Sequence, residues 1–229
     1  MGSTSVGVRM FDINYAFQIL PKLLGASLLT FEATLGGISL AIIGGLILAV
    51  GRLSRRMPIQ VAVICYVEFF RTTPLLVQLF FLFFFLPTIG LTLPALVAGI
   101  VGLGLHYSSY TSEVYRSGVE SVPRGQWEAA YALNLSPART WVSIILPQAI
   151  AIVIPALGNY LLAMFKDTPV LFTITVTELL GRAMIEADIT YRYFEPLAII
   201  GLIFLALSIL ASFAVRQVER QFARRSTGK

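Results

Sequence analysis

Long apolar runs alternate with short polar stretches along most of the chain. A bilayer-spanning helix needs about 20 mostly apolar residues, and several of the runs reach that length. A helix also satisfies its own backbone hydrogen bonds, which lipid cannot do. The pattern therefore predicts an all-α integral membrane protein with about five transmembrane helices. The expected spans are residues 27–50, 59–86, 93–116, 144–165 and 196–215.

The first predicted span contains two glycine pairs, Gly36-Gly37 and Gly44-Gly45, eight residues apart. Small residues at such spacings let neighbouring helices approach closely. Residues 14–22 precede the span and are expected to form a short amphipathic lead-in that Pro21 breaks. The pattern thus predicts close helix packing along the span and a separate segment before it.

Periodicity alone does not assign two later stretches. The fourth span is expected to end at residues 166–169, and residues 170–180 are again apolar but short. They form either a broken continuation of that span or a re-entrant helix. Residues 181–195 are charged, and we interpret them as a loop or an interfacial helix.

Composition favours lipid as the solvent of this chain. It is 57% hydrophobic and 13% charged, with a mean hydropathy of +0.81. A soluble domain carries roughly 25% charged residues, so this chain has too little charge to cover a water-facing surface. Cys65 is the only cysteine and lies in an apolar run, where we expect a small buried hydrophobe. A disulfide framework and a cysteine metal site are excluded, and no metal site is predicted.

The formal charge of +5 does not indicate nucleic-acid binding, because the cations lie beside the apolar segments as topology signals do. One set of connections holds eleven cations and the opposite set holds five, diluted by five acids between Asp167 and Glu195. The larger set is expected in the cytoplasm, which places the N-terminus outside and the C-terminus inside. It comprises Arg52, Arg55, Arg56, Arg116, Arg124, Arg139, Arg216, Arg220, Arg224, Arg225 and Lys229.

Residues 118–141 are the longest polar interruption and are expected on the cytoplasmic side. Pro123 suits the first position of a helix, where its missing N–H costs nothing. Trp127, Ala130 and Tyr131 then form a compact apolar face at helical spacing. Asn134 is expected to end this helix, because asparagine tolerates the left-handed conformation best after glycine.

A second helix is expected to start at once, with Ser136 as its N-cap and Pro137 at its first position. The segment therefore predicts a helix, a sharp corner and a second helix, held rigidly between two spans. Such a rigid element can transmit force to or from a soluble partner.

Several ionisable or polar residues fall inside the predicted spans, where such residues usually serve a function. Glu68 and Arg71 are three residues apart on one helical face. A zwitterionic solute needs both a carboxylate and a cation as partners, and the set supplies both. The candidate pathway residues are Glu68, Arg71, His106, Ser109, Tyr110 and Glu113, with Lys166 and Asp167 as gate or structural residues.

Structural roles remain open for several of these residues. Glu68 and Arg71 could equally form an ion pair that only holds the fold together. His106 suits packing better than catalysis, and Glu113 with Arg116 could brace the polar segment that follows. No catalytic residue is predicted.

The polar segment resembles the signature loop of permease subunits of bacterial ABC importers. It reads Glu128-Ala-Ala, a corner residue, then Ile145-Leu-Pro147, and the family usually has glycine where this chain has Asn134. The polar-amino-acid branch is resembled at Glu68-Phe-Phe-Arg-Thr-Thr-Pro-Leu-Leu-Val-Gln78, Glu113-Val-Tyr-Arg-Ser-Gly118 and Ser121-Val-Pro-Arg-Gly-Gln-Trp-Glu-Ala-Ala130. Ala132-Leu-Asn-Leu-Ser136, Leu105-His-Tyr-Ser108 and Phe165-Lys-Asp-Thr-Pro169 are most similar to ectoine/hydroxyectoine permeases.

The resemblance implies a multi-pass protein of the bacterial inner membrane. Residues 123–135 would be the coupling helix, seated in a cleft of an ATPase subunit with Trp127, Ala129 and Ala130 packed into the groove. The residues implied in coupling are Pro123, Gly125, Trp127, Glu128, Ala129, Ala130, Asn134 and Pro147.

The implied partners are two ATP-binding cassette subunits, a second permease in a homodimer or heterodimer, and a substrate-binding protein that delivers the solute. The chain has no phosphate-binding loop, so ATP and magnesium would bind the ATPase partner and this chain would not be an enzyme. The sequence leaves the solute open between a polar amino acid and an ectoine-like compatible solute.

Three other functions compete with this interpretation. A secondary transporter or channel would need no ATPase, but no internal repeat is visible and the rigid corner would be unexplained. A membrane enzyme is disfavoured by the single histidine, and a passive assembly scaffold stays possible. We expect a flexible extension at residues 1–13, with Met1 or Met10 as the start, one permease domain at 14–220 and a basic cytoplasmic tail at 221–229.

Overall fold

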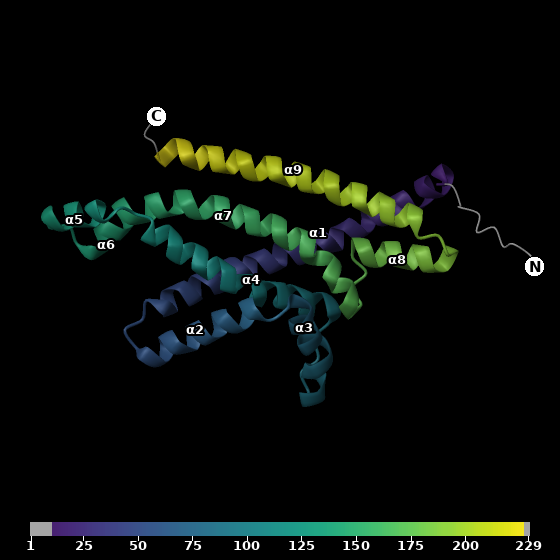
Figure 1. Ribbon diagram of the computed structural model, residues 1–229, viewed down its shortest axis with the longest axis horizontal. Coiled ribbons are helices and arrows are strands. Elements are labelled where there is room, and N and C mark those ends of the chain that lie inside the picture. The colour runs from purple at the N-terminus through teal and green to yellow at the C-terminus, as the bar shows by residue number, and fades with distance from the viewer. Residues whose placement is uncertain (1–10, 227–229) are drawn as a thin grey trace, which may run out of the picture.

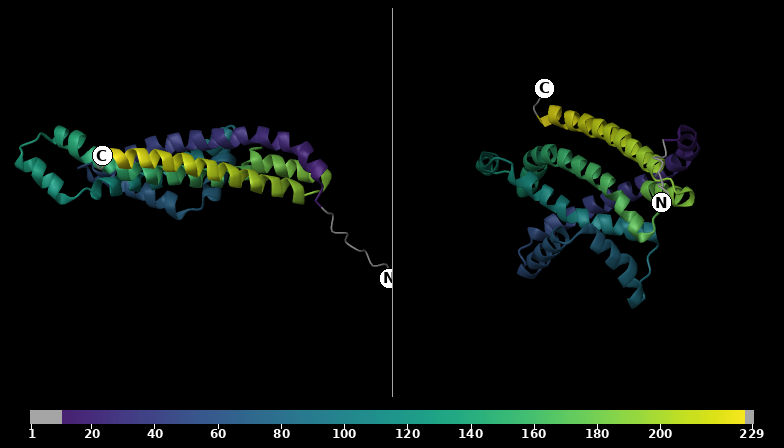
Figure 2. Two further views of the ribbon diagram at one scale, coloured as in Figure 1. Left: turned by 90° about the horizontal axis from the view of Figure 1, so that it is seen from above. Right: turned by 45° about the vertical axis from the view of Figure 1, so that its right-hand side comes forward.

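The computed structural model describes residues 11–226, and every element among them is helical. The long helices α1 (Ile13–Arg52), α7 (Leu146–Asp167) and α9 (Phe194–Ser226) extend along the molecule, with α4 (Ala95–Glu120) packed between α1 and α7 (Figure 1). Seen from above, the bundle is elongated, with α5 and α6 at one end and α8 at the other (Figure 2). The all-α prediction is confirmed for the described residues.

Three helical stretches of the described chain are long and apolar enough to cross a membrane: Ile13–Arg52, Pro137–Ile174 and Phe194–Val218. A bent pair, Met57–Thr72 with Leu75–Ile89, passes as a fourth if it forms one span. Helix α4 is not among them, because its second half is polar. That half is mostly buried against neighbouring helices, so it need not match lipid. The structure supports three or four apolar spans and does not confirm five.

The second predicted span is not one straight helix. Helix α2 (Met57–Thr72) ends before Thr73, and the helical stretch Leu75–Ile89, which begins with α3 (Leu75–Phe80), leaves it at an angle of 108°. Thr73 is extended, with ψ 139°, as the residue before a proline prefers. The Gln78 amide donates to the carbonyl of Thr73 at 3.0 Å and to that of Phe70 at 3.0 Å, which satisfies carbonyls freed by the break.

Helix α3 projects to the side of the bundle and continues as a π turn, η1 (Phe81–Phe85), and a 3₁₀ turn, η2 (Leu86–Ile89) (Figure 1). Cys65, on α2, is exposed, so the expectation of a buried small hydrophobe is wrong. Both findings follow from α2 and α3 lying at the periphery rather than inside the bundle.

The glycine pairs do allow close packing, as predicted. A Cβ atom on Gly37 would lie 2.8 Å from the Met164 sulfur, and one on Gly45 would lie 2.0 Å from the Thr111 hydroxyl oxygen. The Thr111 hydroxyl donates across the interface to the Ala41 carbonyl at 2.7 Å. Helices α1 and α4 form the largest interface of the molecule.

Residues 14–22 are the first turns of α1 and not a separate segment, and Pro21 lies inside that helix. Helix α1 persists there because its buried Ile19 and Leu23 pack on α8 (Leu179–Thr190) and α9. Lys22 also pairs with Glu186 of α8 at 2.9 Å. Tertiary contacts thus outweigh the cost of the interior proline.

After α7, residues Thr168–Ile174 continue as the 3₁₀ helix η4, which favours the broken-continuation alternative over a re-entrant helix. Most of residues 181–195 belong to α8, so the loop alternative is wrong there. The N-cap of α8 is the buried Glu178, which accepts from the Gly181 amide at 3.0 Å.

The division into an extension, a domain and a tail stays a prediction. Residues 1–10, with both candidate starts, and residues 227–229 lie outside the described chain. Within it, Asp12 caps α1 and pairs with Arg192 at 3.1 Å, and Phe11 packs edge-on against Phe194. Helix α9 continues through residues 221–226 of the expected tail.

Candidate functional site

The polar segment between α4 and α7 folds as a helix, a corner and a second helix, which we call the elbow (residues 123–141). Its first helix is α5 (Arg124–Ala132). Asn134 has φ 48°, the left-handed conformation predicted for it. The Asn134 amide donates to the Tyr131 carbonyl at 2.9 Å, and the Leu135 amide donates to the Ala130 carbonyl at 3.1 Å. This is the Schellman pattern, and it fixes the direction of the corner.

The second helix of the elbow runs without a break into the core. Ser136 accepts from the Arg139 amide at 3.4 Å and caps α6 (Pro137–Thr140), as predicted. A π turn, η3 (Trp141–Ile145), then joins α6 to α7, whose second residue is the exposed Pro147. Pro123 is the N-cap of α5 and not its first helical residue, because its ψ of 139° is extended.

Two tryptophans hold the elbow to the rest of the chain. The rings of Trp127 and Trp141 meet edge to face with centroids 5.4 Å apart. Ala130 is buried, and Trp127 packs on a cluster built from Val122, Ile145 and Ala149. Trp127 and Ala130 therefore stiffen the elbow from inside, and they do not form the outward face expected from the resemblance.

The outward face of the elbow contains both apolar and charged groups. Tyr131 is 86% exposed and Leu133 is 71% exposed. Gly125, Glu128 and Ala129 are exposed on the same helix. Tyr131 therefore does not share one face with the buried Ala130, and the single apolar face expected of Trp127, Ala130 and Tyr131 is divided between the inside and the outside of the elbow. The elbow thus combines a rigid backbone with an unpartnered surface that can bind another protein.

A second cluster lies on the polar half of α4. The Tyr107 hydroxyl donates to the Asp167 carboxylate at 2.6 Å. The ring centroid of Tyr160, on α7, lies 6.0 Å from that of Tyr107 and 5.7 Å from that of Tyr110. Three tyrosines and one carboxylate from two helices thus surround one region, which we call the tyrosine cluster (Tyr107, Tyr110, Tyr160 and Asp167).

Helices α2 and α3 add polar groups to the tyrosine cluster. The Arg71 guanidinium lies 5.7 Å from the Tyr110 ring centroid, in cation–π range. His106 Nδ1 lies 3.1 Å from the Gln78 side-chain oxygen. Glu68 is exposed and makes no salt bridge with Arg71 among residues 11–226. The alternative of a Glu68–Arg71 ion pair is therefore wrong in this structure.

The remaining predicted pathway residues lie apart from the tyrosine cluster. Glu113 pairs with Arg52 of α1 and with Arg116 at 2.7 Å, as the bracing alternative proposed. Ser109 is buried, and its hydroxyl donates to its own helix at the His106 carbonyl. Lys166 is exposed and lines a shallow cavity of about 380 Å³ against α9.

Sequence reasoning missed Tyr107, Tyr160 and Gln78. Tyr107 stands beside His106 in a run already marked as polar, and it could have been included. Tyr160 and Gln78 are isolated in apolar runs, and only the packing of α3 and α7 on α4 reveals them.

Comparison with known proteins supplies the family. Residues 16–224 match the family described as "Binding-protein-dependent transport system inner membrane component". A "probable amino-acid ABC transporter permease protein" of Sinorhizobium fredii is 45% identical over 214 residues, which is 93% of each chain. The "L-cystine transport system permease protein" of Bacillus subtilis is 34% identical over 89% of each chain.

A solved structure agrees with these relatives. The crystal structure of an amino acid ABC transporter with histidines contains a chain with a TM-score of 0.88 and 33% identity, which covers 92% of this chain and 99% of that one. The chain described here therefore belongs to the family of inner membrane components of binding-protein-dependent transport systems, and it is a permease subunit of the ABC transporter class.

Proposed function

We propose that this chain forms part of the translocation pathway of an ATP-driven importer for an amino acid or a related zwitterion. The observation that carries the proposal is the elbow, whose left-handed corner at Asn134 holds an exposed face rigidly at the end of the bundle. A rigid elbow converts the closure of an attached motor into motion of the helices on both of its sides.

The partner at the elbow is an ATP-binding cassette subunit. Tyr131 and Leu133 offer exposed apolar area, and Glu128 adds a charge that a basic groove would bind. ATP and magnesium bind that partner. Two ATPase subunits, a second permease and a solute-binding protein would complete the transporter.

The proposed orientation of the chain in the membrane rests on counting α4, which other helices enclose, as the fifth span. An odd number of spans places the two chain ends on opposite sides of the membrane. Helix α1 begins near α8, whereas α9 ends toward the elbow (Figure 1), which agrees with that arrangement. The arginine-rich turn after α1 and the arginine-rich end of α9 lie at the elbow end, and this end would be cytoplasmic.

The solute would bind at the tyrosine cluster. Arg71 can hold a carboxylate, and Asp167 can hold an ammonium or amidinium group. The aromatic rings between them suit a compact cationic group. Two relatives carry names that specify amino acids or L-cystine. Ectoine and hydroxyectoine also carry both charges, and the preference for them rests on the sequence resemblance.

Uptake by the reconstituted transporter tests the proposal. Proteoliposomes that contain the permease, ATPase and binding protein should accumulate labelled solute only with ATP. Glu128→Lys should abolish uptake while membrane insertion stays normal, and Asp188→Lys, at an exposed position of α8 at the opposite end of the bundle, serves as the charge-matched control. Accumulation without ATP would instead favour a secondary transporter, and normal uptake by Glu128→Lys would refute docking at the elbow.

The solute site has a separate test. Arg71→Gln and Asp167→Asn should each lower uptake at a subsaturating solute concentration by about tenfold or more, since each removes one charge-assisted bond worth roughly 1.5–3 kcal/mol. Glu113→Gln should leave the apparent affinity for the solute unchanged, because Glu113 binds Arg52 and Arg116 instead. Equal effects of all three substitutions would contradict the placement of the site.

A further inference from the structure

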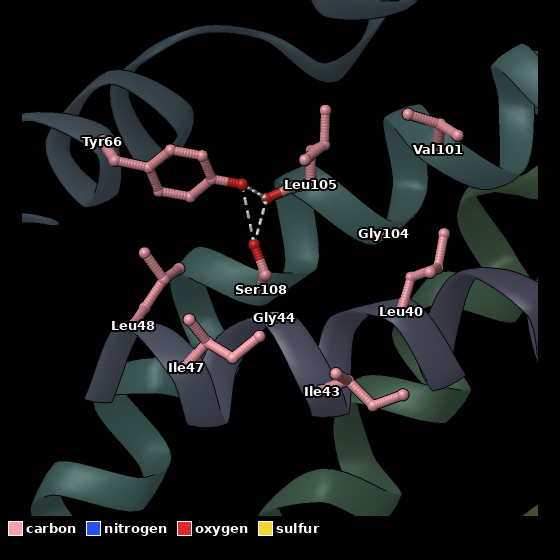
Figure 3. A pocket seen from close by; sticks show the side chains of 10 residues that line it. All are labelled: Leu40, Ile43, Gly44, Ile47, Leu48, Tyr66, Val101, Gly104, Leu105 and Ser108. Carbon is pink, nitrogen blue, oxygen red and sulfur yellow. Dashed lines mark hydrogen bonds between the residues drawn. The ribbon is translucent and has the colours of Figure 1, made fainter. Parts of the chain in front are cut away.

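An apolar groove lies where α1, α2 and α4 meet, and none of its lining residues belongs to the tyrosine cluster. Its volume is about 460 Å³, and it follows α1 from Leu40 to Leu48, a rise of about 12 Å (Figure 3). The lining is almost entirely hydrocarbon. It consists of Leu40, Ile43, Gly44, Ile47, Leu48, Tyr66, Val101, Gly104, Leu105 and Ser108.

The two polar side chains of the groove are already hydrogen-bonded. The Tyr66 hydroxyl donates to the Leu105 carbonyl at 3.0 Å and lies 2.9 Å from the Ser108 hydroxyl oxygen (Figure 3). The Ser108 hydroxyl donates to the same carbonyl at 2.7 Å. The groove therefore leaves no polar group for a polar solute, and its surface suits an alkyl chain.

One end of the groove continues into a basic turn. Four residues beyond Leu48, Arg52 ends α1, and the turn into α2 then presents Arg55 and Arg56. Arg52 is paired with Glu113. Arg55 and Arg56 are exposed and form no salt bridge within the described part of the chain.

The basic turn has a defined shape. The Gln60 amide donates to the Ser54 carbonyl at 2.8 Å and to the Arg52 carbonyl at 3.4 Å, and Ser54 accepts from the Arg56 amide at 3.2 Å. These bonds fix the backbone of the turn that carries Arg55 and Arg56, just beyond the Leu48 end of the groove.

We propose that this groove binds an anionic phospholipid, with an acyl chain along Leu40–Leu48 of α1 and the phosphate headgroup at Arg55 and Arg56. An alkyl chain beside a fixed negative charge matches a hydrocarbon groove beside two unpaired cations. Basic pockets between transmembrane helices at a membrane surface bind anionic headgroups in this way. Because Tyr66 ties α2 to α4 across the groove, the lipid would also hold α1 against that pair.

A second apolar cavity shows why the nearby cations, and not the apolar lining alone, favour an anionic lipid at the groove. It has a volume of about 350 Å³ and lies at the opposite end, between the start of α1 and α9. The cation near that end, Arg192, is paired with both Asp12 and Glu195. Lys22 and Arg182, the other cations of that end within residues 11–226, are paired with Glu186, so the described residues give that cavity no preference for an anionic headgroup.

The lipid proposal rests on the proposed placement of α1 and α2 in the bilayer, but not on the solute or on ATP. It can be tested on the assembled transporter in phosphatidylcholine vesicles that contain a photoreactive phospholipid. Two probes with the same diazirine-bearing acyl chain would be compared, one with a phosphatidylglycerol headgroup and one with a phosphatidylcholine headgroup. Labelled peptides are then mapped by mass spectrometry.

The phosphatidylglycerol probe should label residues 40–48 and 101–108 more than the phosphatidylcholine probe does. Arg55→Gln and Arg56→Gln should each reduce that excess by about fivefold, whereas Arg216→Gln and Arg220→Gln on α9 should not. Ile47→Trp should block labelling by filling the groove. Leu46→Trp, its neighbour outside the lining, should leave labelling intact and also shows that the fold tolerates tryptophan on α1.

Equal labelling by the two probes would overturn the proposal, because the groove would then take any annular lipid. Adducts that avoid residues 40–48 and 101–108 would overturn it as well, because the groove would then hold no lipid. Since the measurement needs neither solute nor ATP, a failure of the transport proposal would leave its result intact.

Discussion

At the scale of single residues, Asn134 determines the direction of the elbow. Its φ of 48° is costly for residues with a branched Cβ and costs glycine nothing. Asn134→Gly should therefore be nearly neutral. Asn134→Val should destabilise the corner by about 1–2 kcal/mol. Thermal unfolding of the purified subunit and recovery of the ATPase complex would measure both effects, and identical behaviour of the two variants would contradict the left-handed corner.

Asp12 gives a prediction about pH. The Tyr15 backbone amide donates to its carboxylate, and this bond, helped by the nearby Arg192 guanidinium, holds the pKa of Asp12 below its ordinary value of 3.8. The folded state thus favours the carboxylate. Its stabilising effect is complete above the ordinary pKa and is lost as the pH falls through the lowered one.

Amide hydrogen exchange in the first turn of α1 would measure this effect. Protection in the wild type should decrease below about pH 4 once intrinsic exchange rates are corrected. Asp12→Asn keeps a capping oxygen but removes the titrating group, so its protection should not change over the same range. A wild-type profile as flat as that of the variant would show that Asp12 does not cap α1.

At the scale of elements, the contact between α1 and α4 depends on the absence of a side chain at Gly45. A methyl group there would overlap the Thr111 hydroxyl and approach the Ser112 amide nitrogen at 2.9 Å. Gly45→Ala should destabilise the subunit by about 1–3 kcal/mol because the interface is overpacked. Gly201→Ala, on α9 with nothing within 4 Å, is the matched control and should be neutral or slightly stabilising. Equal melting temperatures for both variants would contradict the close contact.

The elements that the sequence predicted well are those whose formation depends on residues close together in the chain. The length of the apolar runs predicted the long helices, and the glycine pairs predicted the close contact between α1 and a neighbouring helix. Asn134 and Ser136 predicted the corner of the elbow. The bend at Thr73 was missed because apolar runs flank Thr73-Pro74 on both sides and were taken together as one span. Helix α8 was ambiguous because its charges are paired at long range, as Glu186 is with Lys22.

The candidate site was predicted only in part for the same reason. His106, Tyr110, Arg71 and Asp167 do come together. Glu113 lies on the same face of α4 as His106 and Tyr110 by helical spacing, but in space it pairs with Arg52 of α1. Helical spacing gives the face of one helix. It cannot say which neighbouring helix covers each turn of that face.

At the scale of the whole molecule, the two ends of the bundle differ in their charged groups. One end carries α8 with its paired charges, and the other carries the elbow, the arginine-rich turn after α1 and the arginine-rich end of α9 (Figures 1 and 2). The tyrosine cluster lies between them. A motor at one end and a solute supply at the other would then act on the same long helices.

Accessibility of the elbow tests this account most directly. Tyr131→Cys in a Cys65→Ser background places one thiol on the exposed face of α5. A membrane-impermeant maleimide should label it in inverted vesicles and not in right-side-out vesicles, and bound ATPase subunits should protect it. Labelling from the outside, or equal labelling with and without the ATPase, would contradict a motor that grips the elbow.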